Sequence, residues 1–393
     1  MLVVEKGSSR DKSPEETSSA MQMNTVSMVS NTNAPKIATD LTWMDMLRGT
    51  AIIGVLFDNW TGYMEFATTP VLLHSVATFF CLVVGPFVHL FFILSGFGLT
   101  IGYYRGSKVS WSWKRWAWRR ITKILIPYAI FVLFSFLMGI VGTYLYTSVD
   151  VRFSWASLLA YLTFTRNFYP PSWMWNWSFW FMPLIIGLYI CFPVLIKILK
   201  KWGPWVLLLI SAFVTYGTLT GVVLYGVLHG HQADLFTFWM IQFSFGMVLA
   251  HLRETIPREL SHLIGPKAFF LGVGLITFSW ALRSYGPVGQ AYNDLFTSVG
   301  IFLVLLNLCC IATAKVRITA RVLTYFSGKS YFMYLIHYPI MQFLIGPPLR
   351  VLTNPIVVIA LGSLYIILVS LLCSFITHPI DKLTSWIYHK YRA

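Results

Sequence analysis

The segment Trp43–Trp60 (WMDMLRGTAIIGVLFDNW) is predicted to be a membrane-spanning helix, yet it carries Asp45, Arg48 and Asp58. A charged side chain in hydrocarbon is costly, so such residues normally face a protein interior or a wet cavity. At 100° per residue, Arg48 and Asn59 share one helix face and Asp58 lies at its edge. The segment therefore predicts a polar site inside a helix bundle. The alternative is an Arg that snorkels to the headgroups and an Asp that caps the far end.

Two histidines lie inside apolar runs, and a histidine ring is well suited to general base catalysis near neutral pH. His89 lies six residues before Ser95 in VGPFVHLFFILSGFGLTIGYY, and His337 lies in SYFMYLIHYPIM. The alternative for His89 is a structural hydrogen bond to a neighbouring helix, and Ser95 fits interhelical hydrogen bonding better than nucleophilic attack. His229 and His231 form a His-Gly-His loop with no third ligand nearby, so the sequence predicts no metal site.

Seven basic residues alternate with four tryptophans in RGSKVSWSWKRWAWRRITKILIPY (residues 105–128). One interpretation is a positive-inside loop with aromatic side chains at the headgroups, and composition alone favours it. The other is a cradle for a polyanionic, ring-bearing ligand such as acyl-CoA, in which Arg and Lys pair with phosphates and a Trp stacks on the adenine. A second Trp-rich run at residues 167–193 predicts an interfacial anchor or the entry for an apolar acceptor.

The composition is that of an integral membrane protein. Of 393 residues, 57% are hydrophobic and only 11% are charged, whereas a soluble domain has about 25% charged residues. The net charge of +15 comes from basic residues in short loops between apolar runs, which indicates membrane topology rather than nucleic-acid binding. The five cysteines all lie in apolar runs and predict buried thiols.

The order of the chain predicts an all-α bundle. Residues 1–41 are polar and rich in Ser and Thr, which predicts a disordered cytosolic tail. Residues 42–385 then form a polytopic transmembrane domain, and residues 386–393 a short tail. The run 154–165 is too short to span and predicts an interfacial helix before Pro170 and Pro171. About ten transmembrane helices are predicted, at 43–60, 76–104, 124–147, 177–197, 204–228, 234–252, 268–283, 293–314, 330–348 and 355–378.

The orientation follows from the distribution of Lys and Arg. With a cytosolic N-terminus, the inside loops hold 20 basic residues and the outside loops hold four: Arg152, Arg166, Arg283 and Arg350. This asymmetry predicts that both termini are cytosolic. We expect the protein in the endoplasmic reticulum or the plasma membrane. Because no large soluble domain is present, any chemistry belongs to the bundle and its loops.

Over about residues 42–385 the chain resembles the membrane-bound acyltransferase-3 family. The resemblance rests on short blocks in the family's order: MDMLRGTAIIGVLFDNW, VHLFFILSGFGL, RRITKILIPY, WSFWFMPLIIGLYICFPVL, SYFMYLIHYPIM and HPIDKL. It implies a multi-span O-acyltransferase that moves an acyl group, most simply acetyl, from acyl-CoA to a hydroxyl of a sugar, lipid or small metabolite. The partners implied are the lipid bilayer, acyl-CoA as a co-substrate and a hydroxyl-bearing acceptor, with no permanently bound cofactor.

The chain departs from the family pattern at the position that matters most. The family pairs an Arg in its first helix with a His eleven residues later, and here Arg48 is followed by Asn59, with Asp58 beside it. Asn has no titration that would make it a base. Lys123 stands where the family tends to an Arg, which keeps the charge but loses bidentate phosphate geometry. A glutamate frequent in a later block is absent around Met182.

The resemblance implies a division of roles among the candidate residues. The donor-binding set is Arg119, Arg120, Lys123 and Ser95. The catalytic set is Arg48, Asp58, Asn59 and His89. Arg48 polarises the thioester or stabilises developing charge, Asp58 or His89 is the base, and Asn59 orients the substrate or stabilises the oxyanion. This interpretation expects Asp58 or His89 within hydrogen-bond reach of Arg48. If neither is there, the alternative gains, namely an inactive relative that serves as a membrane transporter or sensor.

Overall fold

The computed structural model describes residues 41–65, 85–108, 110–145, 154–169, 175–225, 234–285, 289, 292–345 and 354–391. Throughout these residues the regular structure is helical and contains no strand, which confirms the predicted all-α class. The predicted N-terminal tail, Cys81, the Pro170-Pro171 break and the loop with His229 and His231 lie outside the described residues, except for Leu41 at the end of the tail.

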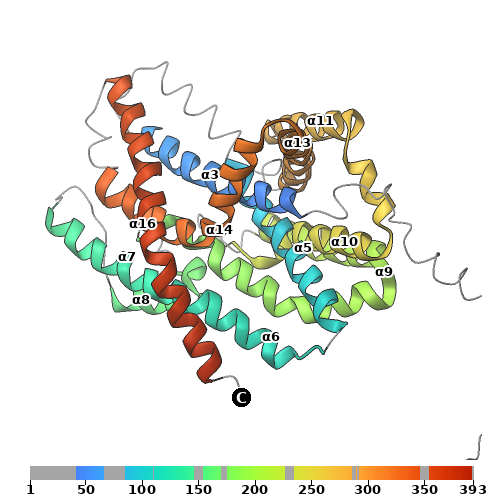
Figure 1. Cartoon of the computed structure of the whole chain (residues 1–393), viewed down its shortest axis with the longest axis horizontal. Helices are drawn as coiled ribbons and strands as arrows, with labels where there is room; N and C mark the ends of the chain where they lie inside the picture. Colours follow the sequence, from blue (N-terminus) through green and yellow to red (C-terminus); the bar gives the residue numbers. More distant parts are fainter. Residues whose placement is uncertain are drawn as a thin grey trace, which may run out of the picture.

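Long helices joined by short 3₁₀ or π turns make up the bundle (Figure 1). The first half of the chain contains α3 (Thr42–Glu65), η1 (Gly85–Phe87), α5 (Val88–Ser107), α6 (Trp113–Arg120), η2 (Ile121–Leu125), α7 (Ile126–Leu145), α8 (Trp155–Leu162), η3 (Arg166–Phe168), η5 (Trp177–Trp180) and α9 (Phe181–Tyr225). The second half contains η6 (Phe236–Trp239), α10 (Met240–Thr255), η7 (Pro257–Leu263), α11 (Pro266–Arg283), α13 (Asp294–Lys315), α14 (Arg317–Ile340), η8 (Met341–Ile345) and α16 (Pro355–Lys390).

Helix α3 lies between two hydrophobic cores. Ile52 and Leu56 belong to the larger core, which α7, α9, α14 and α16 also form. Met46 and Leu47 belong to the second core, shared with α10 and α13. All four side chains are fully buried. Because both cores anchor α3, its polar residues are held in fixed positions relative to the surrounding helices.

Glycines allow α5 and α10 to cross at backbone contact. A Cβ on Gly96 would collide with the carbonyl oxygen of Phe243, and a Cβ on Gly246 would collide with that of Ile93. Gly49 of α3 meets the carbonyl of Leu323 on α14 in the same way. Small residues that let backbones approach are typical of helix contacts in membranes, where burial of apolar surface does not favour association. These crossings fix α5 against its neighbours.

Helix α9 is two helices in sequence. Its 45 residues would measure about 68 Å as one straight helix, twice the hydrocarbon thickness of a bilayer. Gly203 adopts φ 88° and ψ 175° and Pro204 follows it, so the helix breaks there. A positive φ is accessible to glycine at little cost. The break lies between the two runs that the sequence predicts as separate helices.

Five described helices have the length and apolar content to cross a membrane. Their bounds are Gly85–Ser107, Trp113–Val141, Trp177–Val222, Asp294–Thr313 and Ile356–Lys390, and a sixth span results if η7 and α11, bent by 61°, count as one. The structure therefore supports a multi-span protein without establishing the predicted ten helices. Helix α10 has 16 residues, fewer than the ~20 that a bilayer needs. Helices α3 and α14 are long enough but carry charged side chains.

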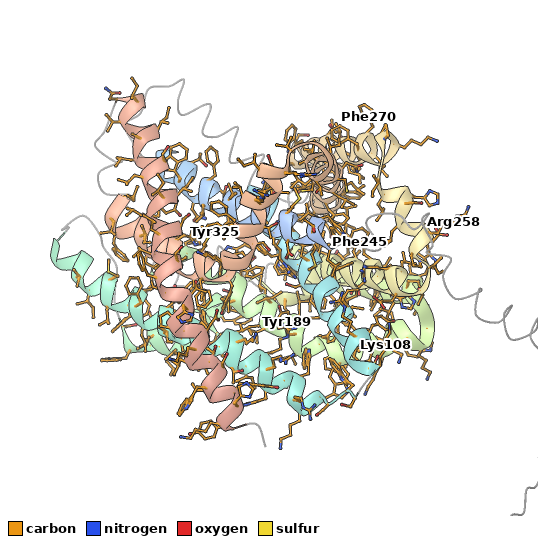
Figure 2. The ribbon with its side chains drawn as sticks, viewed as in Figure 1. Lys108, Tyr189, Phe245, Arg258, Phe270 and Tyr325 are labelled. Carbon is orange, nitrogen blue, oxygen red and sulfur yellow. The ribbon has the colours of Figure 1, made fainter. Side chains whose placement is uncertain are left out.

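The outer surface of the bundle is strongly apolar. Phe270, which is 69% exposed, points outward from α11 in Figure 2, and Phe213 and Phe375 are at least 75% exposed. Such a surface suits contact with lipid. The predicted short helix in the run 154–165 is present as α8, whose Trp155 is 78% exposed.

Candidate functional site

A cavity of about 280 Å³ lies between α3, η2, α5, α9 and α14, and we name it the Arg48 cavity. Val88, Phe91 and Ser95 line it from one face of α5, at the i, i+3, i+7 spacing of a helix. The other lining residues are Arg48, Ile124, Phe181, Met182, Ile185, Tyr189, Ser330, Tyr331 and Tyr334. Most of this surface is apolar, and among the described residues Arg48 is the one charged side chain that lines it.

Arg48 lies between α3, α5 and α14. Its Nη1 lies 3.5 Å from Oδ1 of Asp45 on its own helix, and Asp45 also accepts a hydrogen bond from Ser327 of α14 at 3.1 Å. Its Nη2 lies 3.0 Å from the position that a Cβ on Gly98 would occupy, so the guanidinium packs closely against the backbone of α5. Such a guanidinium presents several N–H donors in a fixed plane, which suits recognition of a phosphate or carbonyl oxygen.

The three basic residues predicted to bind the donor point in different directions. Arg120 lies over the ring of Tyr189, a residue of the Arg48 cavity, at 5.8 Å. Arg119 lies over Tyr388 of α16 at 5.7 Å, and Lys123 is exposed. The π turn η2 begins directly after Arg120. The structure therefore brings only Arg120 of this set toward Arg48.

The tryptophans of the same segment stack on protein rings. Trp113 is stacked on Tyr103 at 5.8 Å, and Trp116 on Phe192 at 5.6 Å. In each pair, the face of the tryptophan ring that stacks on a protein ring is not accessible to a ligand. This arrangement fits the structural interpretation of the Trp-rich segment better than a stacking site for adenine.

A second cavity, of about 340 Å³, lies at the other end of α5, and we name it the His89 cavity. It is lined by Gly85, Val88, His89, Arg166, Asn167, Trp177, Trp180, Asp234 and Trp239. Trp177 is 53% exposed, so the cavity reaches the protein surface beside it. Aromatic rings beside charged and amide side chains suit a ligand with both apolar faces and hydroxyl groups.

Arg166, Asn167 and Asp234 join the wall of this cavity, although the sequence identified Arg166 only as an outside-loop charge. Arg166 is 3% exposed and donates through Nη1 to Oδ1 of Asn167 at 3.1 Å. Asn167 donates in turn to the backbone carbonyls of Trp180 and Asp234, both at 3.1 Å. One amide thus ties η3, η5 and the segment before η6 together. Asp234 is a rare acidic residue at the edge of an apolar run, and this feature of the sequence could have identified it as a candidate site residue.

His89 is a buried residue that lines the cavity through its ring. It is 7% exposed and packs against Trp239, with ring centroids 4.6 Å apart. Its Nδ1 is buried and has no hydrogen-bond partner in the described part of the chain. A neutral imidazole keeps one nitrogen as an acceptor, which is the form that a general base requires.

Asp58 and Asn59 do not act together with Arg48. An oxygen of Asp58 lies 3.0 Å from the position of a Cβ on Gly85, at the edge of the His89 cavity. The side chain of Asn59 donates to the carbonyl of Val55 on its own helix at 2.9 Å. The Asn59 side chain is thus hydrogen-bonded within its own helix, and it lines neither of the two cavities.

The two cavities meet at Val88, which lines both. The guanidinium of Arg48 lies level with Gly98, nine residues or about 13 Å along α5 from His89. Asp58, beside Gly85, is farther still. The expectation that one of these residues lies within hydrogen-bond reach of Arg48 is therefore wrong, because antiparallel α3 and α5 place the two charged groups at opposite ends of one wall.

His337 has a tautomer fixed by its own helix. Its Nδ1 lies 2.7 Å from the carbonyl oxygen of Tyr334 and 3.2 Å from that of Met333. Because carbonyl oxygens only accept, Nδ1 carries the proton and Nε2 is a buried acceptor without a partner in the described residues. His337 lines neither of the two cavities. No group of three His, Cys, Asp or Glu side chains that could hold a metal occurs among the residues described.

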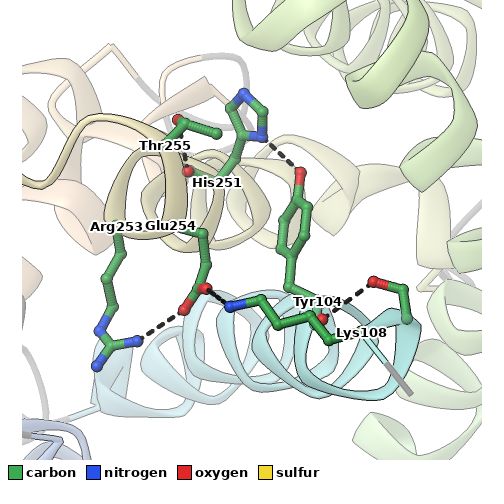
Figure 3. A network of polar contacts seen from close by, with 7 residues as sticks. Tyr104, Lys108, His251, Arg253, Glu254 and Thr255 are labelled. Atoms are coloured by element: carbon green, nitrogen blue, oxygen red, sulfur yellow. Dashed lines mark hydrogen bonds and ion pairs between the residues drawn. The ribbon is translucent and has the colours of Figure 1, made fainter. Parts of the chain in front are cut away.

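A polar network fixes the far ends of α5 and α10 beyond their glycine crossing (Figure 3). Tyr104 hydrogen-bonds to Nδ1 of His251 at 2.6 Å, and Lys108 lies 3.4 Å from Glu254. Arg253 pairs with the other oxygen of Glu254 at 2.9 Å. Such pairs contribute little stability each, and they join the C-terminal turns of α5 and α10.

Asp234 gives the His89 cavity a testable dependence on pH. It lies in the extended segment before η6, and burial raises its pKa from the ordinary 3.8 to about 6, against the opposing effect of Arg166. A raised folded-state pKa stabilises the fold below about pH 4, and this contribution is lost as pH rises through about 6. We expect Asp234→Asn to have a higher thermal midpoint than wild type at pH 7.5, and the difference to disappear near pH 4.

The measurement is a thermal unfolding series in detergent from pH 4 to 8. Asp381→Asn, which removes an exposed carboxylate from α16, is the matched control and should follow wild type throughout. A difference between Asp234→Asn and wild type that is constant with pH would contradict the assignment.

Comparison with known families accounts for most of the chain. The family model described as an acyltransferase domain, Acyl_transf_3, matches residues 41–375. Neither the curated proteins nor the solved structures contain a match to the chain. The matched range includes both cavities and every residue that lines them.

Proposed function

Because the chain belongs to the acyltransferase-3 family, we propose that it is an integral membrane O-acyltransferase that moves an acyl group, most simply acetyl, from acyl-CoA to a hydroxyl. The observation that carries the proposal is that the two cavities share the lining residue Val88, next to a buried histidine that lines one of them. The two cavities, of about 280 and 340 Å³, are near the lower end of the size range of small-molecule sites. One would hold the donor and the other the acceptor.

The Arg48 cavity is the proposed donor site. Its apolar wall suits an acyl chain and pantetheine arm, while Arg48 and Arg120 supply positive charge for phosphate or carbonyl oxygens. This end of the bundle carries most of the basic residues, so it faces the cytosol under the positive-inside rule. Both termini are then cytosolic, where acyl-CoA is available.

The His89 cavity is the proposed acceptor site. The ring of His89 takes the proton of the acceptor hydroxyl as the hydroxyl oxygen attacks the thioester carbonyl carbon. The carbon–sulfur bond breaks, the acyl group stays on the acceptor oxygen, and the thiolate of CoA leaves and takes up the proton. Trp177, Trp180 and Trp239 would pack on the apolar faces of the acceptor, while Arg166 and Asp234 meet its polar groups.

The separation of Arg48 from His89 is consistent with the proposed reaction. A base beside Arg48 would be required if donor and acceptor shared one pocket. With two cavities in contact, Arg48 binds the donor at one end and His89 acts at the junction, one residue from Val88. The rival hypothesis is a transporter or sensor that kept the fold. Its support is Asn59, which bonds to its own helix in the place of the family's histidine, and the absence of Asp58 and His89 from the reach of Arg48.

The experiment is acyl transfer from radiolabelled acetyl-CoA in membranes that contain the protein, with label followed into lipid and soluble hydroxyl compounds. We expect wild type to label a product. Arg48→Ala and Arg120→Ala should lower kcat/KM for acetyl-CoA by about 10- to 100-fold, the loss expected for a charged hydrogen bond. Arg119→Ala, whose side chain faces α16, is the matched control and should stay within about twofold of wild type.

Two results would contradict the proposal. Label no higher than in membranes without the protein, over a broad set of acceptors, would favour the transporter or sensor. Equal losses in Arg119→Ala and Arg120→Ala would remove the Arg48 cavity as the donor site, because of the two only Arg120 lies over a residue that lines it.

A further inference from the structure

We propose that the side chain of Val88 is the partition between the two cavities and determines the length of acyl group that the protein transfers. The inference rests on the proposed function for its chemistry. The geometry itself comes from the two cavities, because Val88 is the residue that lines both of them.

The partition is one side chain thick on the side of α5. Val88 is the first residue of α5 and is partly exposed to the cavities on its two sides. Its neighbours divide between the two cavities: His89 and Gly85 line one, and Phe91 and Ser95 line the other. An isopropyl group is therefore the barrier on this wall.

The facing wall, on η5 and α9, is similarly thin. Trp180 lines the His89 cavity, and the next residue, Phe181, lines the Arg48 cavity. Their rings are perpendicular, with centroids 6.3 Å apart, and Phe181 contacts Phe91 of α5 at 6.2 Å. Consecutive aromatic residues, the half-buried Trp180 and the buried Phe181, thus form the wall between the cavities on this side.

The position of Val88 suits selection of an acyl chain. A thioester carbonyl within reach of the His89 ring lies close to Val88, because both side chains line the His89 cavity. The short acyl group attached to it then contacts the isopropyl group. One methylene more or less in an apolar pocket changes specificity by about 10- to 200-fold, so loss of the two valine methyl groups should be readily measurable.

The test compares acetyl-, butyryl- and hexanoyl-CoA as donors for wild type, Val88→Ala and Val88→Phe. We expect Val88→Ala to raise the ratio of kcat/KM for hexanoyl- to acetyl-CoA by about tenfold or more. Val88→Phe should lower transfer from every donor, and most strongly from the longer ones. Val248→Ala is the matched control, since it removes the same methyl groups from a buried valine of α10 that lines neither cavity. An unchanged ratio in Val88→Ala, or an equal change in Val248→Ala, would overturn the inference.

A second measurement does not depend on catalysis. Val88→Cys in proteoliposomes is treated with a small charged methanethiosulfonate from one side or the other, with wild type as the blank for the native cysteines. We expect modification from both sides, and slower modification when acetyl-CoA is present on the side of the Arg48 cavity. Modification from one side only would refute the partition even if wild type is active. Modification from both sides in an inactive protein would instead refute the proposed acyl transfer and leave the partition standing.

Discussion

Replacement of His89 with alanine is expected to lower the rate of acyl transfer by about 100- to 10,000-fold, the usual contribution of a general base. The reason is the position of the ring: His89 lines the proposed acceptor cavity and is the only histidine that lines either cavity among the described residues. KM for the donor should stay within about twofold, because His89 does not line the Arg48 cavity. The measurement is steady-state transfer from acetyl-CoA with purified protein.

His337→Ala is the control that separates a base from a buried histidine. Both rings have an unpartnered nitrogen in the described structure, but His337 lines neither cavity. We expect His337→Ala to lower stability through lost packing while the rate per folded molecule changes by less than about tenfold. If His89→Ala retained its rate and Asp58→Asn lost it, the base would be Asp58 at the edge of the same cavity.

The largest effect on stability is expected from Gly246→Ala. In an open helix position this change is favourable, since alanine has a helix propensity about 1 kcal/mol better than glycine. At Gly246 the new Cβ collides with the carbonyl of Ile93, a backbone atom that cannot rotate away. Helices α5 and α10 must separate, so we expect a loss of about 3 kcal/mol or more, at the upper end of the cost of overpacking.

A thermal denaturation series followed by size-exclusion chromatography measures this effect. Gly102→Ala is the matched control, because Gly102 lies on α5 with nothing within 4 Å of its Cβ position. It should equal or slightly exceed wild type. Gly96→Ala, on the other side of the same crossing, should behave like Gly246→Ala. If Gly246→Ala had the same thermal stability as Gly102→Ala, the inferred close approach of the α5 and α10 backbones would be wrong.

The sequence by itself determined the class of protein and the residues to examine. Apolar runs and scarce charge are sufficient for an all-α membrane bundle, since a lipid environment requires every backbone polar group to be paired within a helix. The charges in α3 and the intramembrane His89 were visible because such residues are costly in hydrocarbon. The order of the short blocks predicted the acyltransferase-3 family, which the match over residues 41–375 confirms.

Only the tertiary structure decided how these residues are grouped. Helical spacing predicted that Arg48 and Asn59 share one helix face. In the structure the Asn59 side chain instead donates to the backbone carbonyl of Val55. Such a local hydrogen bond competes with any partner across the bundle. The direction of Arg120 toward Tyr189 depends on how α6 docks. Arg166 and Asp234 line the His89 cavity because the segments that carry them pack against the N-terminal end of α5. Contacts between residues far apart in sequence follow from packing of helix against helix, and a periodic pattern along one helix does not specify them.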